Sequence, residues 1–359
     1  MPVVWGSNLR VRMAHFCTMT NKGVFRCFLA AVLFGASTPA ASRLAGDMPT
    51  LVLAGLLYLG AALAMSPSTL RTPQPLRKLR KGGRRLAVAV FFGGALGPAL
   101  LIAGLVRVPA ATGSLLLNFE LVATVAIAAI VFHENLGRRM LAATALVLGS
   151  GILLVWQPAS GLKFGGLLVI AACIAWGIDN SATARIDQLT PAQITFAKGS
   201  VAGTANLLLG LIFFNTTGIT PARVVIALVI GAIGYGVSIT LWVKGARDLG
   251  ASRGQVIFAI APFIGAAISW TLLGETASAI QILALCIASA GVALSLKTTH
   301  IHGHQHRALE HEHEHGHDDA HHFHPHLLPV GRRHTHRHAH EPMEHVHPHY
   351  PDIHHGHDH

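Results

Sequence analysis

The chain has 359 residues, of which 52% are hydrophobic and only 12% charged, and its formal net charge is +11. Soluble domains carry about 25% charged residues, so the composition excludes an ordinary soluble globular protein and indicates a membrane protein. The basic residues lie in loops between apolar runs and form no basic face interleaved with aromatic residues, which argues against a nucleic-acid partner.

The first 23 residues lack the apolar core that a signal peptide needs. We expect residues 1–23 to form a disordered N-terminal segment without a function of its own.

Ten segments from residue 24 onward are long and apolar enough to cross a bilayer, which takes about 20 residues of helix. They lie at 24–44, 48–66, 86–106, 110–132, 139–158, 164–185, 190–214, 224–243, 254–273 and 277–296. The expected fold is therefore an all-α membrane protein of ten transmembrane helices. Short linkers predict antiparallel neighbours, and the pairs Gly93/Gly97 and Gly199/Gly203 would let helix backbones approach closely.

The apolar body consists of two similar copies, 24–158 and 162–297. A shift of 142 residues, and of 141 from about residue 99, aligns Phe34-Gly35 with Trp176-Gly177, Arg43 with Arg185, Pro49 with Pro191, Gly104 with Gly245 and Glu134 with Glu275. This period is far longer than the roughly 20–50 residues of a solenoid unit. It predicts a duplicated five-helix unit.

Lysine and arginine counts predict the orientation. Successive loops lie on alternate sides of the membrane. The loops of one side hold thirteen lysine and arginine residues and those of the other side hold four, so the first side is expected to be the cytoplasm. With ten spans, both termini are then expected in the cytoplasm as well. Because five is an odd number, the two copies must then be inverted relative to each other, as in carriers that work by alternating access. We expect this carrier in a bacterial plasma membrane.

These residues resemble the drug/metabolite transporter superfamily, specifically its EamA-type carriers with two five-helix repeats, over about residues 24–297. The resemblance rests on Phe34-Gly35 with Pro39 and Arg43, on Trp176-Gly177 with Asp179-Asn180, and on Phe132-His133-Glu134 and Leu273-Gly274-Glu275. The last two segments are similar to the family's Gly-Glu signature, with His133 in place of glycine in the first copy. The resemblance implies the fold and transport as a general activity. It implies no single substrate, because relatives move amino acids, drugs, sugars, nucleotide-linked sugars and small cations.

Charged side chains at membrane depth cost about 2.5–3.5 kcal/mol each, so they are candidates for function. The candidate substrate-binding or coupling residues are Asn118, Glu120, Asp179, Asn180 and Lys198. Asp179 and Lys198 lie at similar depths and are predicted to form an interhelical ion pair, which either fixes the packing or takes part in binding substrate or a proton. Glu120 has no evident partner in the sequence and is a candidate to take up a proton during the transport cycle.

Residues 298–359 form a histidine-rich tail, and 23 of the 25 histidines lie at positions 300–359. The tail has few large apolar residues, so we expect it to be disordered and cytoplasmic. Imidazole binds Zn, Ni, Co and Cu(II), and several weak sites are expected. The candidate metal ligands are His302, His304, His306, His311, His313, His315 and His317. A tolerated low-complexity tail that binds metal without a purpose is the alternative.

The leading functional hypothesis is a secondary transporter that exports small metabolites by alternating access, with the bilayer and a small molecule as partners and no required cofactor. A divalent-metal efflux carrier is one alternative, and a membrane-anchored metal buffer that depends only on the tail is another. An intramembrane enzyme is not supported, because the spans hold no paired aspartates, serine–histidine set or histidine pair. The sequence makes no prediction of the oligomeric state or of the coupling ion.

Overall fold

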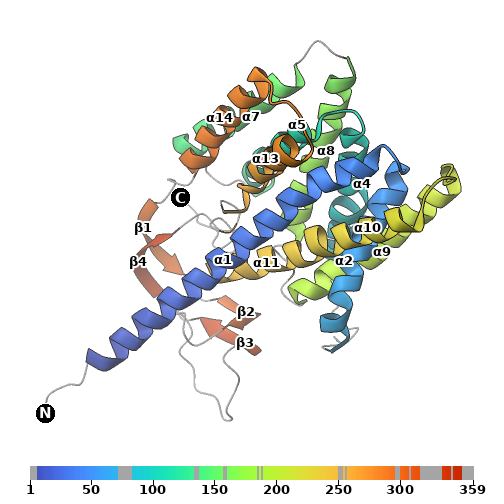
Figure 1. Ribbon diagram of the computed structural model, residues 1–359. Helices are drawn as coiled ribbons and strands as arrows, with labels where there is room; N and C mark the ends of the chain where they lie inside the picture. Colours follow the sequence, from blue (N-terminus) through green and yellow to red (C-terminus); the bar gives the residue numbers. More distant parts are fainter. Residues whose placement is uncertain are drawn as a thin grey trace, which may run out of the picture.

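A computed structural model shows a bundle of helices followed by two pairs of strands (Figure 1). The residues that it describes are 6–71, 83–132, 137–156, 160–183, 186, 189–249, 254, 257–295, 300–306, 309–315, 334–340 and 343–349.

The first copy of the repeat folds into helices that cross the bundle back and forth. They are α1 (Gly6–Ala45), α2 (Thr50–Arg71), the π-helical segment η1 (Ala89–Leu96) with α4 (Gly97–Leu105), α5 (Ala110–Leu116), α6 (Phe119–Phe132) and α7 (Arg138–Val155).

The segment expected as the second copy contains the remaining helical elements. They are α8 (Ser160–Thr183), α9 (Pro191–Phe213), α10 (Pro221–Ile230) with the π-helical segment η2 (Gly231–Val237) and α11 (Ser238–Leu249), α13 (Ala261–Leu272) and α14 (Ala279–Ser295). Threonine N-caps begin two of these helices. Thr190 accepts from the backbone of Gln193 in a capping box, and Thr220 accepts from that of Arg223.

Eight helical stretches within the described residues are long and apolar enough to cross a membrane. They are Lys22–Ala45, Thr50–Arg71, Gly83–Leu105, Ala110–Val131, Arg138–Val155, Lys163–Thr183, Pro191–Phe213 and Pro221–Ala246. The last two expected spans contain shorter apolar helices, Ala261–Leu272 and Ala279–Leu294. The expectation of a helical multi-pass membrane protein is thus confirmed, although eight rather than ten helices meet the length criterion in this part of the chain.

Glycine residues allow α2 and α9 to pack with their backbones in contact. A side chain on Gly55 would collide with the backbone of Leu207 and Gly203, and one on Gly199 would collide with the backbone of Tyr58. The glycine pair predicted from the sequence therefore lies at a helix crossing, as small residues in membrane bundles usually do. At another edge of the bundle α7 packs along α14 (Figure 1).

One end of the bundle is closed by contacts between the two copies. The backbone N–H groups of Ala110 and Ala111, at the start of α5, donate to the two carboxylate oxygens of Glu275 at 2.7 and 3.0 Å. Arg43, near the end of α1, donates to the carbonyl oxygen of Leu273 at 3.3 Å. Glu275 is thus a helix-end residue, as expected, and it joins a loop of the second copy to a helix of the first. The equivalent residues of the first copy, His133 and Glu134, lie outside the described residues.

Several expected spans are not continuous α-helices. The expected span 110–132 is broken at Leu117–Asn118 between α5 and α6, and a turn at Ala259–Ile260 precedes α13 in the expected span 254–273. The expected spans 86–106 and 224–243 contain the π-helical segments η1 and η2. Hydropathy does not distinguish these turns from α-helix, because the residues that form them are equally apolar.

Both chain ends differ from expectation. Helix α1 begins at Gly6 rather than near residue 24. The tail, expected to be disordered, contains strands β1 (His300–His306), β2 (Leu309–His315), β3 (His334–His340) and β4 (Met343–His349). Their alternating sequences suit extended chains, because successive residues of a strand point to opposite faces.

The strands pair as β1–β4 and β2–β3, both antiparallel. The register places His302 opposite His347 and His313 opposite His336. The side chains of these strands, and the candidate ligand His317 altogether, lie outside the described part of the structure.

We predict that Gly55→Ala lowers the thermal unfolding temperature of the detergent-solubilised protein, because the new methyl group forces α2 away from α9. Overpacking of this kind costs about 1–3 kcal/mol. The matched control is Gly149→Ala in α7, where an added Cβ would meet nothing within 4 Å. Equal melting temperatures for the two variants would contradict the proposed crossing.

Candidate functional site

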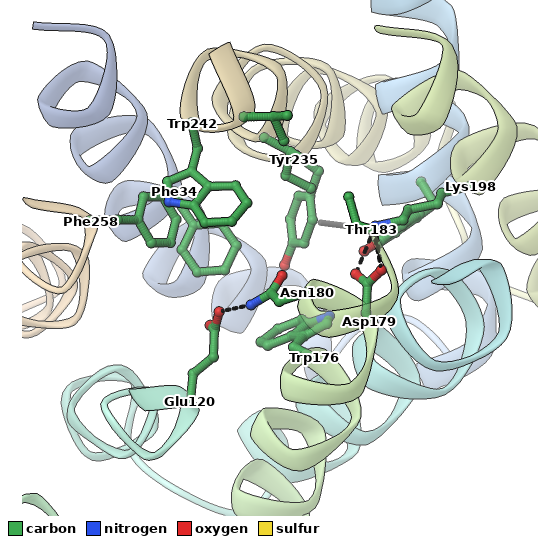
Figure 2. Close-up of a pocket in the computed structure, with 13 residues that line it drawn as sticks. Phe34, Glu120, Trp176, Asp179, Asn180, Thr183, Lys198, Tyr235, Trp242 and Phe258 are labelled. Carbon is green, nitrogen blue, oxygen red and sulfur yellow. Dashed lines mark hydrogen bonds and ion pairs between the residues drawn. The ribbon is translucent and has the colours of Figure 1, made fainter. Parts of the chain in front are cut away.

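A cavity with about 550 Å³ of space not filled by atoms lies in the middle of the bundle; we call it the main cavity (Figure 2). Its aromatic lining residues are Phe34, Tyr58, Trp176, Tyr235, Trp242 and Phe258. Its polar lining residues are Glu120, Asp179, Asn180, Thr183 and Lys198. Four of the five residues singled out from the sequence therefore meet in one place.

A buried ion pair forms one side of the main cavity. The Lys198 ammonium lies 2.5 Å from Oδ1 and 2.7 Å from Oδ2 of Asp179, and the two side chains are 5% and 8% exposed. Thr183 accepts from Lys198 at 3.1 Å and donates to Asp179 at 2.9 Å. The interhelical ion pair predicted from the sequence is confirmed, and its charges cancel within the wall of the cavity.

The π-helical segment η1 provides the space for this ion pair. Gly93, in η1, has no side chain, and the Asp179 carboxylate occupies the position that a Cβ would need. The Gly93 carbonyl oxygen accepts from the Tyr58 hydroxyl at 2.5 Å and from the Trp176 indole at 3.2 Å. A π-helical turn displaces carbonyl groups from the regular α-helical ladder, and such turns are frequent at functional sites.

Glu120 forms the opposite side of the main cavity and is not without a partner, contrary to the sequence-based expectation. The Asn180 side chain donates to its Oε1 atom at 2.6 Å, and Figure 2 shows these two side chains meeting away from Lys198. Sequence reasoning missed this contact because Glu120 and Asn180 are separated by 60 residues.

The aromatic rings form a connected group around Phe34, which is buried and belongs to α1. Its ring centroid lies 5.4 Å from that of Phe258, 5.7 Å from that of Tyr235 and 5.9 Å from that of Trp176. The sequence analysis used Phe34 and Trp176 only as markers of the repeat. Their equivalence in the two copies is the signal that could have placed both at the centre. Aromatic faces attract cations, and a carboxylate beside them strengthens that preference.

A smaller cavity, with about 310 Å³ of empty space, lies next to the main one; we call it the second cavity. Phe34, Glu120 and Phe258 line both cavities. Asn118, predicted to act with Glu120, lines only the second cavity, at the break between α5 and α6. In the part of the chain that the structure describes, no three His, Cys, Asp or Glu side chains gather as a metal site would require.

The sequence matches the model of the EamA-like transporter family twice, over residues 21–156 and 163–297. The chain belongs to this family. It is therefore a membrane transporter rather than an enzyme, and the double match agrees with the repeat expected from the sequence.

Two relatives of this EamA-like transporter are informative. A protein of Salmonella typhimurium described as a "Probable amino-acid metabolite efflux pump" is 26% identical over 282 residues, which is 74% of this chain and 91% of that protein. An "Uncharacterized transporter" of Methanothermobacter thermautotrophicus is 26% identical over 193 residues, 52% of this chain and 56% of its own. A solved structure described as "Crystal structure of protein" has a TM-score of 0.55 and 17% identity, and the match covers 78% of this chain and 98% of that chain, which is a likeness of fold alone.

We predict that Asp179→Asn and Lys198→Met each destabilise the EamA-like transporter, because each leaves the other charge buried without its partner. Breaking a buried pair in this way costs about 3–5 kcal/mol. The double variant should lose much less than the sum of the two, as measured by denaturant unfolding in detergent. Additive losses would show that the two side chains do not stabilise each other.

Proposed function

We propose that this transporter exports small metabolites that carry an amino group, and that it does so by alternating access between two inverted five-helix repeats. The observation that carries the proposal is the main cavity, in which a carboxylate faces a group of aromatic rings at the centre of the bundle. The name of the Salmonella relative, an amino-acid metabolite efflux pump, agrees with this substrate class.

The charges of the main cavity support an amine as the substrate group. Lys198 and Asp179 neutralise each other, so Glu120 supplies the net negative charge of the lining. An ammonium group placed between Glu120 and the face of Phe34 or Trp176 would gain both an ion pair and a cation–π contact. The apolar remainder of such a metabolite would contact the other rings.

The direction of transport is inferred from the shape of the bundle and the loop charges. The main cavity extends to Thr183, the last residue of α8, whereas the contacts of Glu275 and Arg43 close the opposite end. The positive-inside rule assigns the end that holds Thr183 to the cytoplasm, together with both termini. In a bacterial plasma membrane with ten spans in this orientation, the cavity would load from the cytoplasm, as an exporter requires.

The proposal predicts that Glu120→Gln lowers efflux of amine-bearing metabolites by at least about tenfold, because one charge-assisted contact is lost. Proteoliposomes loaded with radiolabelled amino acids and their amines would measure this flux. The matched control is Asp47→Asn, which removes an exposed carboxylate paired with Arg223 and should leave flux unchanged. Full flux through Glu120→Gln would refute the assignment.

We also propose that the tail binds divalent transition metals such as Zn, Ni, Co or Cu. Its support is the strand register, which sets histidines opposite one another in both strand pairs, as in His304 with His345 and His311 with His338. Directly opposite residues in antiparallel strands lie on the same face. In this proposal the bound metal regulates export. In a metal carrier the metal would itself be exported, and in a metal buffer it would only be stored.

Removal of residues 300–359 should abolish Ni²⁺ and Zn²⁺ binding in isothermal titration while most of the metabolite flux remains. A carrier of metal would lose metal tolerance with either the truncation or Glu120→Gln. A buffer would keep metal tolerance in the full-length Glu120→Gln variant and lose it only with the truncation. Metal binding that survives the truncation would refute the assignment to the tail.

A further inference from the structure

The second cavity has a mostly apolar lining with two polar side chains, Asn118 and Glu120. It lies where the broken helix of the first copy, at Leu117–Asn118, faces the turn at Ala259–Ile260 of the second. Its lining contains the Glu120 carboxylate and no lysine, arginine, serine, threonine, tyrosine or tryptophan. A cavity of this composition attracts a cation rather than an anion.

Asn118 contributes an amide oxygen that has no partner. The residue is 4% exposed, and its side-chain nitrogen donates to the carbonyl oxygen of Leu115 at 3.1 Å. Because a carbonyl can only accept, this contact fixes which end of the amide is nitrogen. The Oδ1 atom accepts no hydrogen bond within the described residues.

The second copy contributes backbone carbonyls that helix formation leaves unused. Residue 262 is a proline and has no N–H group, so it cannot donate to the carbonyl of Phe258 four residues earlier. Phe263 donates to Ile260 instead of Ala259. The Phe258 carbonyl therefore lacks its regular α-helical partner, no backbone N–H of the described residues bonds the Ala259 carbonyl, and both residues line the cavity.

We propose that the second cavity is a sodium site, formed by the Glu120 carboxylate, the Asn118 side-chain oxygen and the carbonyl groups of Phe258 and Ala259. Hard cations take oxygen ligands, and unwound helices inside membrane proteins supply them with free carbonyls. One negative charge balances a monovalent ion, whereas a divalent ion would leave a net charge in an apolar surrounding. The few oxygens available suit Na⁺ better than K⁺, which takes more ligands.

This site gives the transport cycle a candidate coupling ion. Glu120 lines both cavities, so sodium in the second cavity and an amine in the main cavity would share one carboxylate. Sodium in the second cavity would then weaken binding of the amine in the main cavity, and the amine would weaken binding of sodium. Exchange of sodium for the metabolite requires this competition. Only this coupling role rests on the proposed metabolite export, because sodium binding itself needs no metabolite.

The test is equilibrium binding of radioactive Na⁺ to the purified full-length protein in detergent, in a buffer free of amines and quaternary ammonium ions. The wild type should bind saturably, and K⁺ should compete far more weakly than unlabelled Na⁺. Asn118→Ala should raise the Kd about tenfold, since one buried ligand is lost. Pro262→Ala should raise it as well, because the new N–H group can bond the Phe258 carbonyl and restore the helix.

Two variants serve as matched controls. Asn206 is another buried amide, which donates to the carbonyl of Ala95, and Pro98 is another proline within a span; neither lines the second cavity. Asn206→Ala and Pro98→Ala should keep the wild-type Kd. Pro262→Ala adds a helical hydrogen bond, so a higher Kd in a variant with an undiminished melting temperature cannot be attributed to misfolding.

Three results would overturn the proposal: no saturable Na⁺ binding by the wild type at pH 8, equal competition by K⁺, or unchanged Kd values for both Asn118→Ala and Pro262→Ala. Each is measured without a metabolite. A failure here therefore leaves metabolite export standing, and a failure of the efflux assay for Glu120→Gln leaves sodium binding standing.

Discussion

The structure depends on one constraint, which is that hydrocarbon offers a backbone no hydrogen-bond partner. A membrane helix must therefore satisfy its own N–H and C=O groups, and irregular backbone survives only where it faces protein or a polar cavity. The molecule follows this rule closely. The break at Leu117–Asn118, the turn at Ala259–Ile260 and the segment η2, through Tyr235, border one of the two cavities, and η1 packs against the Asp179 carboxylate that lines the main cavity. The departures from regular helix thus mark the functional centre.

The two copies of the repeat share their packing and differ in their chemistry. Gly93 packs against Asp179, and the equivalent glycine of the second copy, Gly234, packs against Ser37. The same close approach of helices therefore holds an ion-paired carboxylate in one copy and a small hydroxyl group in the other.

The sequence was sufficient for the helical body and the Lys198–Asp179 pair, because these follow from hydropathy and helical rise. It was insufficient for the Glu120–Asn180 contact, since nothing in a linear pattern brings α6 against α8 at those two positions. The aromatic group around Phe34 was missed for a related reason. An aromatic residue in an apolar span looks the same whether it faces lipid or a cavity.

The backbone breaks were equally hidden from hydropathy, although Pro262 offered a local indication. Proline within a span frees a carbonyl, but its consequence depends on what lies opposite, and only the folded chain places Asn118 across the cavity from it. The opposite error occurred at the two chain ends, where the structure is more regular than the sequence indicated. There, low hydrophobicity suggested disorder in segments whose backbone forms regular structure.

The π-helical segments also carry a record of how the two copies diverged. Their first residues, Ala89 and Gly231, are 142 positions apart, and their last residues, Leu96 and Val237, are 141 apart, so one copy is a residue longer within this segment. A wide helical turn can absorb or release a single residue without rotating the helices on either side of it. A difference of one residue between η1 and η2 is therefore compatible with an unchanged orientation of the helices on either side.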